Sequence, residues 1–162
     1  MTRIYVDADG CPVKDEVRKV AKRYGVPVSF VANAPLRLGS DALFEMVVVP
    51  DNGKLNVADD WIAERAGQGD IVVTTDIPLA ARCLAKGAAT LDHRGGEFTE
   101  ERIGHALAGR ELMAQLRAMD VASGGPRPFE QRDRSRFLQR LDQAINAARR
   151  RSGAKTSITD EH

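Results

Sequence analysis

Residues 3–12, R-I-Y-V-D-A-D-G-C-P, determine how the rest of the chain is arranged. Ile4, Tyr5 and Val6 form the β-branched and aromatic run that is typical of a buried strand. The run stops at the acidic turn of residues 7–10, and Pro12 suits the first position of a following helix. Two carboxylates therefore lie where a strand gives way to a helix. In parallel α/β sheets, ligands bind at this carboxyl edge of the strands.

The two carboxylates of this turn are Asp7 and Asp9. Carboxylates placed so close together repel one another and lose hydration, so they need a cation, a proton or several backbone N–H donors. A simpler alternative is that one of them caps the helix that follows. A cap requires only one aspartate, so the pair favours a functional role.

The pattern along the chain predicts an α/β fold. Apolar runs typical of buried strands occupy residues 26–31, 44–49, 71–74 and 88–91, and helical patterns occupy residues 13–24, 58–67 and 78–86. Strands that alternate with helices of about ten residues form parallel sheets with right-handed crossovers. We therefore expect a three-layer α/β/α sandwich with a mostly parallel five-stranded sheet, plus C-terminal helices at residues 99–119 and 130–150.

The chain of 162 residues is long enough for one continuous core, and no apolar run approaches the ~20 residues of a membrane helix. We expect an α/β domain with its packing helices over residues 1–122. A loop and a basic C-terminal helix at residues 123–151 should pack on that domain, and residues 152–162 should form a mobile tail. Two cysteines and no signal-peptide pattern favour a cytoplasmic protein.

Charge is distributed unevenly. Residues 127–151 hold eight arginines against three acidic residues, a net charge of +5, whereas residues 1–126 have a net charge of −3. An acidic front part followed by a basic helix suits a metal site beside a polyanion-binding surface, although a solvated arginine-rich helix face would give the same pattern.

Further acids follow the other predicted strands. Asp76 follows the fourth strand, Asp59 begins the helix after the third, and Asp92 follows the fifth. Because parallel strands end at the same edge of a sheet, we expect these acids to share a rim with Asp7 and Asp9. Oxygen ligands of this kind bind hard divalent cations. Taken singly, Asp59 and Asp76 also fit as helix N-caps.

Several ordered segments resemble one known family. They are V-D-A-D-G-C-P (6–12), V-A-N-A-P-L-R (31–37), V-A-D-D-W-I (57–62), D-I-V-V-T-T-D-I-P-L-A (70–80), H-R-G (93–95) and G-G-P-R-P-F-E-Q-R-D-R (124–134). Together they resemble the YaiI/YqxD family of small bacterial proteins, which is similar to the PIN-like superfamily.

The resemblance implies a PIN-like fold and a metal-dependent nuclease that acts on RNA or single-stranded nucleic acid. It implies that Asp7, Asp59 and Asp76 hold Mg²⁺ or Mn²⁺, with Asp9 and Asp92 as supporting acids. The predicted substrate-binding residues are Asn33, Arg37, Arg94, Arg132 and Arg134. The chain departs from the PIN pattern in its D-x-D pair and its added basic helix.

Two other functions fit the same residues. The D-A-D-G-C stretch resembles the nucleophile loop of haloacid-dehalogenase-type phosphatases, in which Asp7 would attack phosphorus and Asp9 would transfer the proton. Thr74 would then bind the phosphate, but Cys11 replaces the usual Thr or Val. The third alternative is a non-catalytic module whose basic helix binds RNA or a protein.

Overall fold

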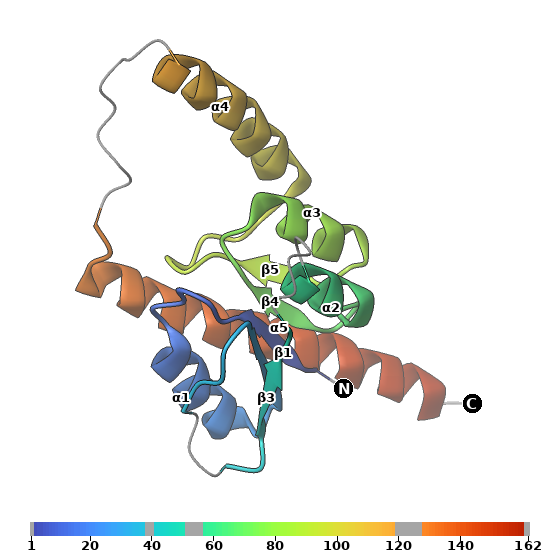
Figure 1. Cartoon of the computed structure of the whole chain (residues 1–162). Coiled ribbons are helices and arrows are strands. Elements are labelled where there is room, and N and C mark those ends of the chain that lie inside the picture. The colour runs from blue at the N-terminus through green and yellow to red at the C-terminus, as the bar shows by residue number, and fades with distance from the viewer. Residues whose placement is uncertain (1, 38–40, 51–56, 119–127, 161–162) are drawn as a thin grey trace.

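The computed structural model describes residues 2–37, 41–50, 57–118 and 128–160, within which strands and helices alternate for most of the chain (Figure 1). The strands are β1 (Ile4–Asp7), β2 (Val28–Ala32), β3 (Phe44–Val48), β4 (Ile71–Val73) and β5 (Ala89–Leu91). The helices are α1 (Lys14–Tyr24), α2 (Val57–Arg65), α3 (Ile77–Ala85), α4 (Glu100–Ala118) and α5 (Gln131–Asp160).

The five strands form one sheet in the order β3-β2-β1-β4-β5, and every neighbouring pair is parallel. The fold prediction is confirmed. Strand β1 is central, and Ile4 is aligned with Val28 of β2 on one side and with Ile71 of β4 on the other. The chain builds outward from β1 to β3 and then crosses back to β4. The strand order therefore reverses between β1 and β4, which is where such sheets open a crevice at their carboxyl edge.

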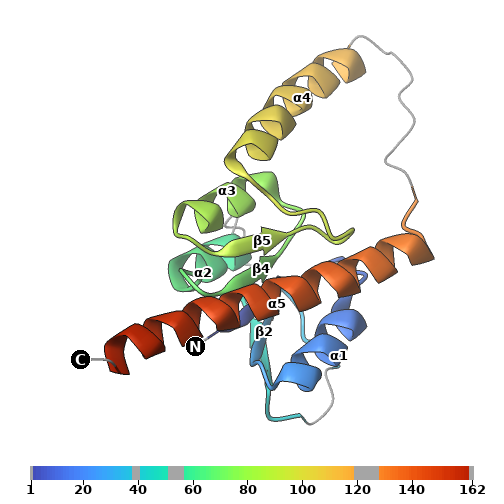
Figure 2. The same ribbon diagram turned by 180° about the vertical axis from the view of Figure 1, so that it is seen from behind.

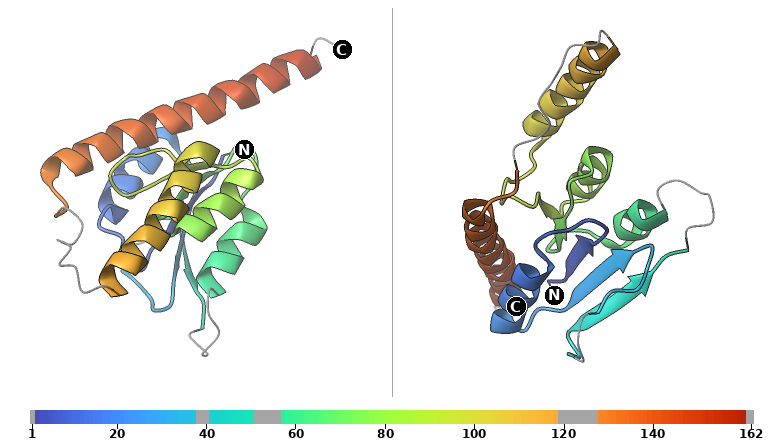
Figure 3. Two further views of the ribbon diagram at one scale, coloured as in Figure 1. Left: turned by 90° about the horizontal axis from the view of Figure 1, so that it is seen from above. Right: turned by 60° about the vertical axis from the view of Figure 1, so that its left-hand side comes forward.

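Side chains of the sheet alternate between two hydrophobic cores, as the period of a strand requires. Ile4 and Val6 belong to the core shared with α1 and α5, whereas Tyr5 belongs to the core shared with α2 and α3. The right-hand view of Figure 3 shows α1 and α5 on one side of the sheet and α2 and α3 on the other. This is the predicted three-layer arrangement.

Helix α5 lies across the sheet beside α1 (Figure 2). Its apolar stripe consists of Phe137, Leu141 and Ile145, all completely buried. Burial of side chains of this size contributes roughly 1.5–3 kcal/mol each, so α5 is an integral part of the domain. The helix continues to Asp160, whereas the sequence predicts an end near Arg150 and a tail from residue 152. Residues 151–160 contain one glycine and no proline, so nothing in them forces the helix to stop.

Helix α4 packs on α3 through a small cluster that contains Ala80, Phe98 and Ile103. Beyond its first turns it points away from the sheet (Figure 1). The predicted loop at residues 123–128 lies outside the described residues except for Pro128, as does the predicted domain boundary at residues 122–123. None of the helices described is long and apolar enough to cross a membrane.

Candidate acidic site at the carboxyl edge

The site begins where β1 and β4 end, at the reversal of strand order. Asp7 is the last residue of β1, and Thr74 follows β4 directly. The Thr74 hydroxyl donates a hydrogen bond to Asp7 Oδ2 at 2.9 Å, and Thr74 Oγ1 accepts one from the Asp76 backbone N–H at 3.0 Å. Thr74 is completely buried. It therefore fixes the Asp7 carboxylate relative to the turn that carries Asp76.

Asp76 is the N-cap of α3. Its Oδ1 accepts a hydrogen bond from the Leu79 backbone N–H at 2.9 Å, and proline follows in the first turn. The capping alternative for Asp76 is thus realised. A cap uses one carboxylate oxygen, however, and the second oxygen remains available to a neighbour.

Asp59, in the first turn of α2, is the neighbour that Asp76 meets. The pKa of Asp59 is raised to about 6, first by burial, then by the negative charges of Asp76 and Asp7 and a side-chain hydrogen bond with Asp76, against the opposing charge of Arg82. A hydrogen bond between two carboxyl groups requires a proton on one of them. Three carboxyl groups from three separate segments therefore interact here.

The Asp7 carboxyl is affected by the same crowding. Burial raises its pKa, the hydrogen bond from Thr74 opposes that change, and the charges of Asp76 and Asp9 add to it. Asp9 lies further out, is exposed, and accepts a hydrogen bond from the Asn33 backbone N–H at 3.0 Å. The structure thus brings Asp7, Asp59 and Asp76 together, with Asp9 at the margin.

The alternative that Asp7 or Asp9 caps the first helix is wrong. Val13 occupies the N-cap position of α1 and makes no side-chain capping hydrogen bond. The D-x-D pair is therefore not explained by helix capping.

The donor set suits a hard cation, because it consists of carboxylate oxygens. Among the residues described, however, no group of three or more His, Cys, Asp or Glu side chains is arranged to hold a metal ion. Metal binding at this edge stays a prediction.

The predicted substrate-binding residues divide into two groups. Asn33 and Arg37 are exposed on the segment after β2, and Asn33 adjoins Asp9. The other three, Arg94, Arg132 and Arg134, surround the start of α5.

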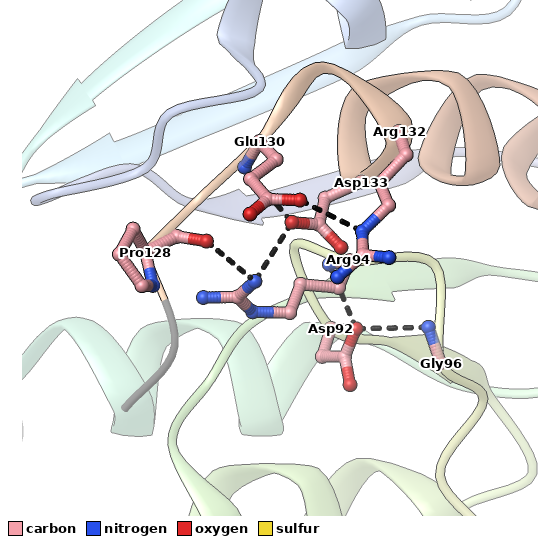
Figure 4. A network of polar contacts seen from close by, with 7 residues as sticks. All are labelled: Asp92, Arg94, Gly96, Pro128, Glu130, Arg132 and Asp133. Carbon is pink, nitrogen blue, oxygen red and sulfur yellow. Dashed lines mark hydrogen bonds and ion pairs between the residues drawn. The ribbon is translucent and has the colours of Figure 1, made fainter. Parts of the chain in front are cut away.

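Figure 4 shows the contacts of Arg94 and Arg132 at the start of α5. Arg94 Nη1 lies 2.8 Å from Oδ2 of Asp133, which is completely buried, and 3.3 Å from the Pro128 carbonyl oxygen. Arg132 Nε lies 2.8 Å from Glu130 Oε2. The Arg94–Asp133 pair holds α5 to the loop after β5, whereas the Arg132–Glu130 pair lies at the start of α5. Substrate contact by Arg94 and Arg132 stays a prediction.

Arg134 joins α5 to the segment after β1. Its Nη1 donates to the Pro12 carbonyl oxygen at 2.7 Å and to Glu16 Oε1 at 3.1 Å. Its guanidinium also lies 5.0 Å from the centre of the Phe129 ring. Arg134 therefore has a structural role in the described fold.

Asp92 is a structural residue. Its Oδ1 accepts hydrogen bonds from the backbone N–H groups of Arg94 and Gly96, both at 2.8 Å, and its Oδ2 pairs with Arg102. These contacts stabilise the turn after β5. They account for Asp92 without a role as a supporting acid.

Two residues near this edge were not among the predicted site residues. Lys14, the first residue of α1, points its Nζ toward the Ala8 carbonyl oxygen at 3.5 Å. His93 follows β5, its Nε2 is buried without a partner in the described part of the chain, and burial lowers its pKa. His93 lies two residues after the end of β5 and Lys14 begins the helix that follows β1, and these positions at the carboxyl edge are the signal that identifies them in the sequence.

Comparison with known proteins identifies the family to which the chain belongs. Residues 5–147 match the model of the family described as "Uncharacterized BCR, YaiI/YqxD family". A UPF0178 protein of Rhodospirillum centenum is 56% identical over 154 residues, which cover 93% of this chain and 99% of the relative. A UPF0178 protein of Parvibaculum lavamentivorans is 56% identical over 151 residues, which cover 93% and 98%. No solved structure matches. The chain therefore belongs to the YaiI/YqxD family.

Proposed function

We propose that this protein is a metal-dependent phosphodiesterase that cleaves RNA or single-stranded nucleic acid. The observation that carries the proposal is the convergence of Asp7, Asp59 and Asp76 where the strand order reverses, with the pKa of Asp59 raised to about 6. Mutual repulsion of this kind lowers stability, and acids with raised pKa values gather at functional sites.

A divalent cation fits this donor set. Asp7, Asp59 and Asp76 would hold the ion, in place of the proton between Asp59 and Asp76. When bound, Mg²⁺ or Mn²⁺ lowers the pKa of a coordinated water molecule and neutralises negative charge on a phosphate. This agrees with the nuclease activity that the resemblance to PIN-like proteins implies.

The chain's own residues position the reacting groups. Thr74 holds the Asp7 carboxylate in one orientation through its hydrogen bond. Asp9 is held by the Asn33 backbone N–H and orients a water molecule at the outer margin of the site. Arg37 is exposed on the segment after β2, four residues beyond Asn33, and forms no ion pair with a described residue, so it is the arginine proposed to steady the phosphate.

The contacts of Thr74 favour this function over the phosphatase alternative. A phosphatase of the haloacid-dehalogenase type would need the Thr74 hydroxyl for substrate phosphate. That hydroxyl is completely buried and already bonded to Asp7 and to the Asp76 backbone. Phosphate would have to displace Asp7, the intended nucleophile, to reach it.

The test is an assay of three labelled substrates, namely single-stranded RNA, single-stranded DNA and a small phosphomonoester, with Mn²⁺ or with chelator. We expect cleavage of a single-stranded substrate that needs Mn²⁺ and is lost in Asp7→Asn. Asp60→Asn is the matched control, because Asp60 lies on the same helix as Asp59 but is exposed and pairs with Arg82 at 2.7 Å. Turnover of the phosphomonoester alone would refute the proposal. Inactivity of the wild type on all three substrates would also refute it, in favour of a binding module.

A further inference from the structure

A groove of about 560 Å³ lies along α5, away from the acidic site. Its other wall includes the residues that precede β4 and β5 together with β5 itself. Small residues, among them Gly69, Gly87 and Ala88, line it on the sheet side, and Arg140, Arg150 and Arg151 line it on the helix side. The groove thus combines small side chains on one wall with three cations on the other.

The arginines of the groove continue along one face of α5. Arg132, Arg136, Arg140 and Arg151 are exposed and lie at helical spacings that place them in one row, with Gln143 and Ala147 between the last two. Nineteen residues separate the ends of the row, which corresponds to about 28 Å of helix at ~1.5 Å per residue. The row therefore reaches from the groove to the start of α5, beside the turn after β5.

Arginines on the other faces of α5 are used in the fold. Arg134 is bound to Glu16 and the Pro12 carbonyl oxygen, and Arg149 lies 5.5 Å from the centre of the Tyr24 ring. In contrast, Arg140, Arg150 and Arg151 form no ion pair with any residue that the structure describes. The three arginines that face the groove thus keep their charge available to a ligand, whereas Arg132, at the far end of the row, pairs with Glu130.

Two acids, Asp70 and Glu97, line the groove against three arginines, which leaves a net charge of +1. Both carboxylate oxygens of Asp70 accept backbone hydrogen bonds, one from Arg3 and one from Gly67, each at 3.1 Å. Glu97 is exposed and is the second acid in the lining. The groove therefore has an excess of positive charge.

We propose that this groove, with the arginine row that extends from it, binds the sugar-phosphate backbone of a single-stranded nucleic acid. A single row of cations matches the single row of phosphates in one strand, whereas a duplex presents two. The row leads toward the loop after β5 and so toward the carboxyl edge of the sheet. The inference rests on the proposed function, since it assigns the substrate of the acidic site a track along α5.

The test measures binding without hydrolysis. The affinity of a fluorescent single-stranded 12-mer RNA is measured by anisotropy over a range of salt concentrations, in chelator and with Asp7→Asn in every protein. The variant adds Arg140→Gln and Arg151→Gln. The matched control adds Lys19→Gln and Lys22→Gln on α1, which contacts the opposite flank of α5 (Figure 2). Both changes remove two exposed positive charges.

We expect the arginine variant to lower the slope of log affinity against log salt by about 1.4, which is on the order of tenfold in affinity at 150 mM salt. The lysine control should leave the slope unchanged. Equal losses in both variants, an unaltered slope in the arginine variant, or no RNA binding at all would overturn the inference. The inference would also be overturned if the protein bound anionic phosphatidylglycerol vesicles but did not bind the RNA. If RNA binding depends on the arginines but the wild type with Mn²⁺ cleaves nothing, the proposed function fails while this inference stands.

Discussion

Replacing Asp59 by asparagine should raise the free energy of unfolding by about 1 kcal/mol at pH 8. The pKa of Asp59 is raised from 3.8 to about 6 by burial and by the charges of Asp76 and Asp7. That rise corresponds to about 3 kcal/mol if solvent screening is ignored. Because Asp59 is only half-buried, solvent screens much of this energy, which leaves about 1 kcal/mol.

The effect should depend on pH in a defined direction. A carboxyl whose folded-state pKa is raised stabilises the protein below its unfolded pKa of 3.8, and the stability is lost as pH rises through about 6. Asparagine does not ionise, so the advantage of Asp59→Asn should fall at pH 4.5 to about a third of its value at pH 8.

Urea denaturation of wild type and Asp59→Asn at the two pH values measures this difference. Asp60→Asn is the control, because it breaks an exposed ion pair with Arg82 and should change stability by less than about 1 kcal/mol, without a gain at pH 8. If Asp59→Asn were no more stable than the wild type at pH 8, or if it gained the same free energy of unfolding at both pH values, the three acids would not repel one another as described.

Three further predictions concern single contacts, and urea denaturation measures each. Thr74→Val should lower the free energy of unfolding by about 2 kcal/mol, because it removes a buried hydroxyl that makes two hydrogen bonds, whereas Thr74→Ser should cost less. Asp133→Ala should cost about 3 kcal/mol because its buried carboxylate pairs with an arginine, and Arg132→Ala, which breaks an exposed pair, should cost less than about 1 kcal/mol. Gly95→Ala should cost about 3 kcal/mol, since its φ is +85° and a Cβ would lie 2.9 Å from the backbone of α5; Gly25→Ala, with φ +65° and no atom within 4 Å, should cost about 1 kcal/mol. If the two variants of any comparison lost the same free energy of unfolding, the role described for that contact would be wrong.

The sequence predicts the fold and the shared edge well, because both depend on local patterns. Apolar runs such as residues 71–73 identify buried parallel strands, and once the strands are parallel, their ends must meet at one edge. The convergence of Asp7, Asp59 and Asp76 follows from that topology.

The roles of the arginines depend on contacts that sequence patterns do not encode. Arg94 pairs with Asp133, 39 residues away, and Arg134 pairs with Glu16, 118 residues away. The sequence indicates only that these side chains are basic and near acidic segments. The sequence also predicts the end of α5 about ten residues too early, because residues 151–160 are polar and carry no apolar stripe that would mark them as helix.

Calorimetric titration of Mn²⁺ into the protein at pH 8 tests most directly whether the acids at the carboxyl edge form a cation site. The account predicts that the wild type and Asp60→Asn bind one or two Mn²⁺ per chain, and that Asp7→Asn binds at least about tenfold more weakly. Asp7→Asn keeps an oxygen that can accept the Thr74 hydrogen bond, so a loss of binding would report on the carboxylate charge. Equal Mn²⁺ affinity in wild type and Asp7→Asn, or no binding by the wild type, would contradict the account.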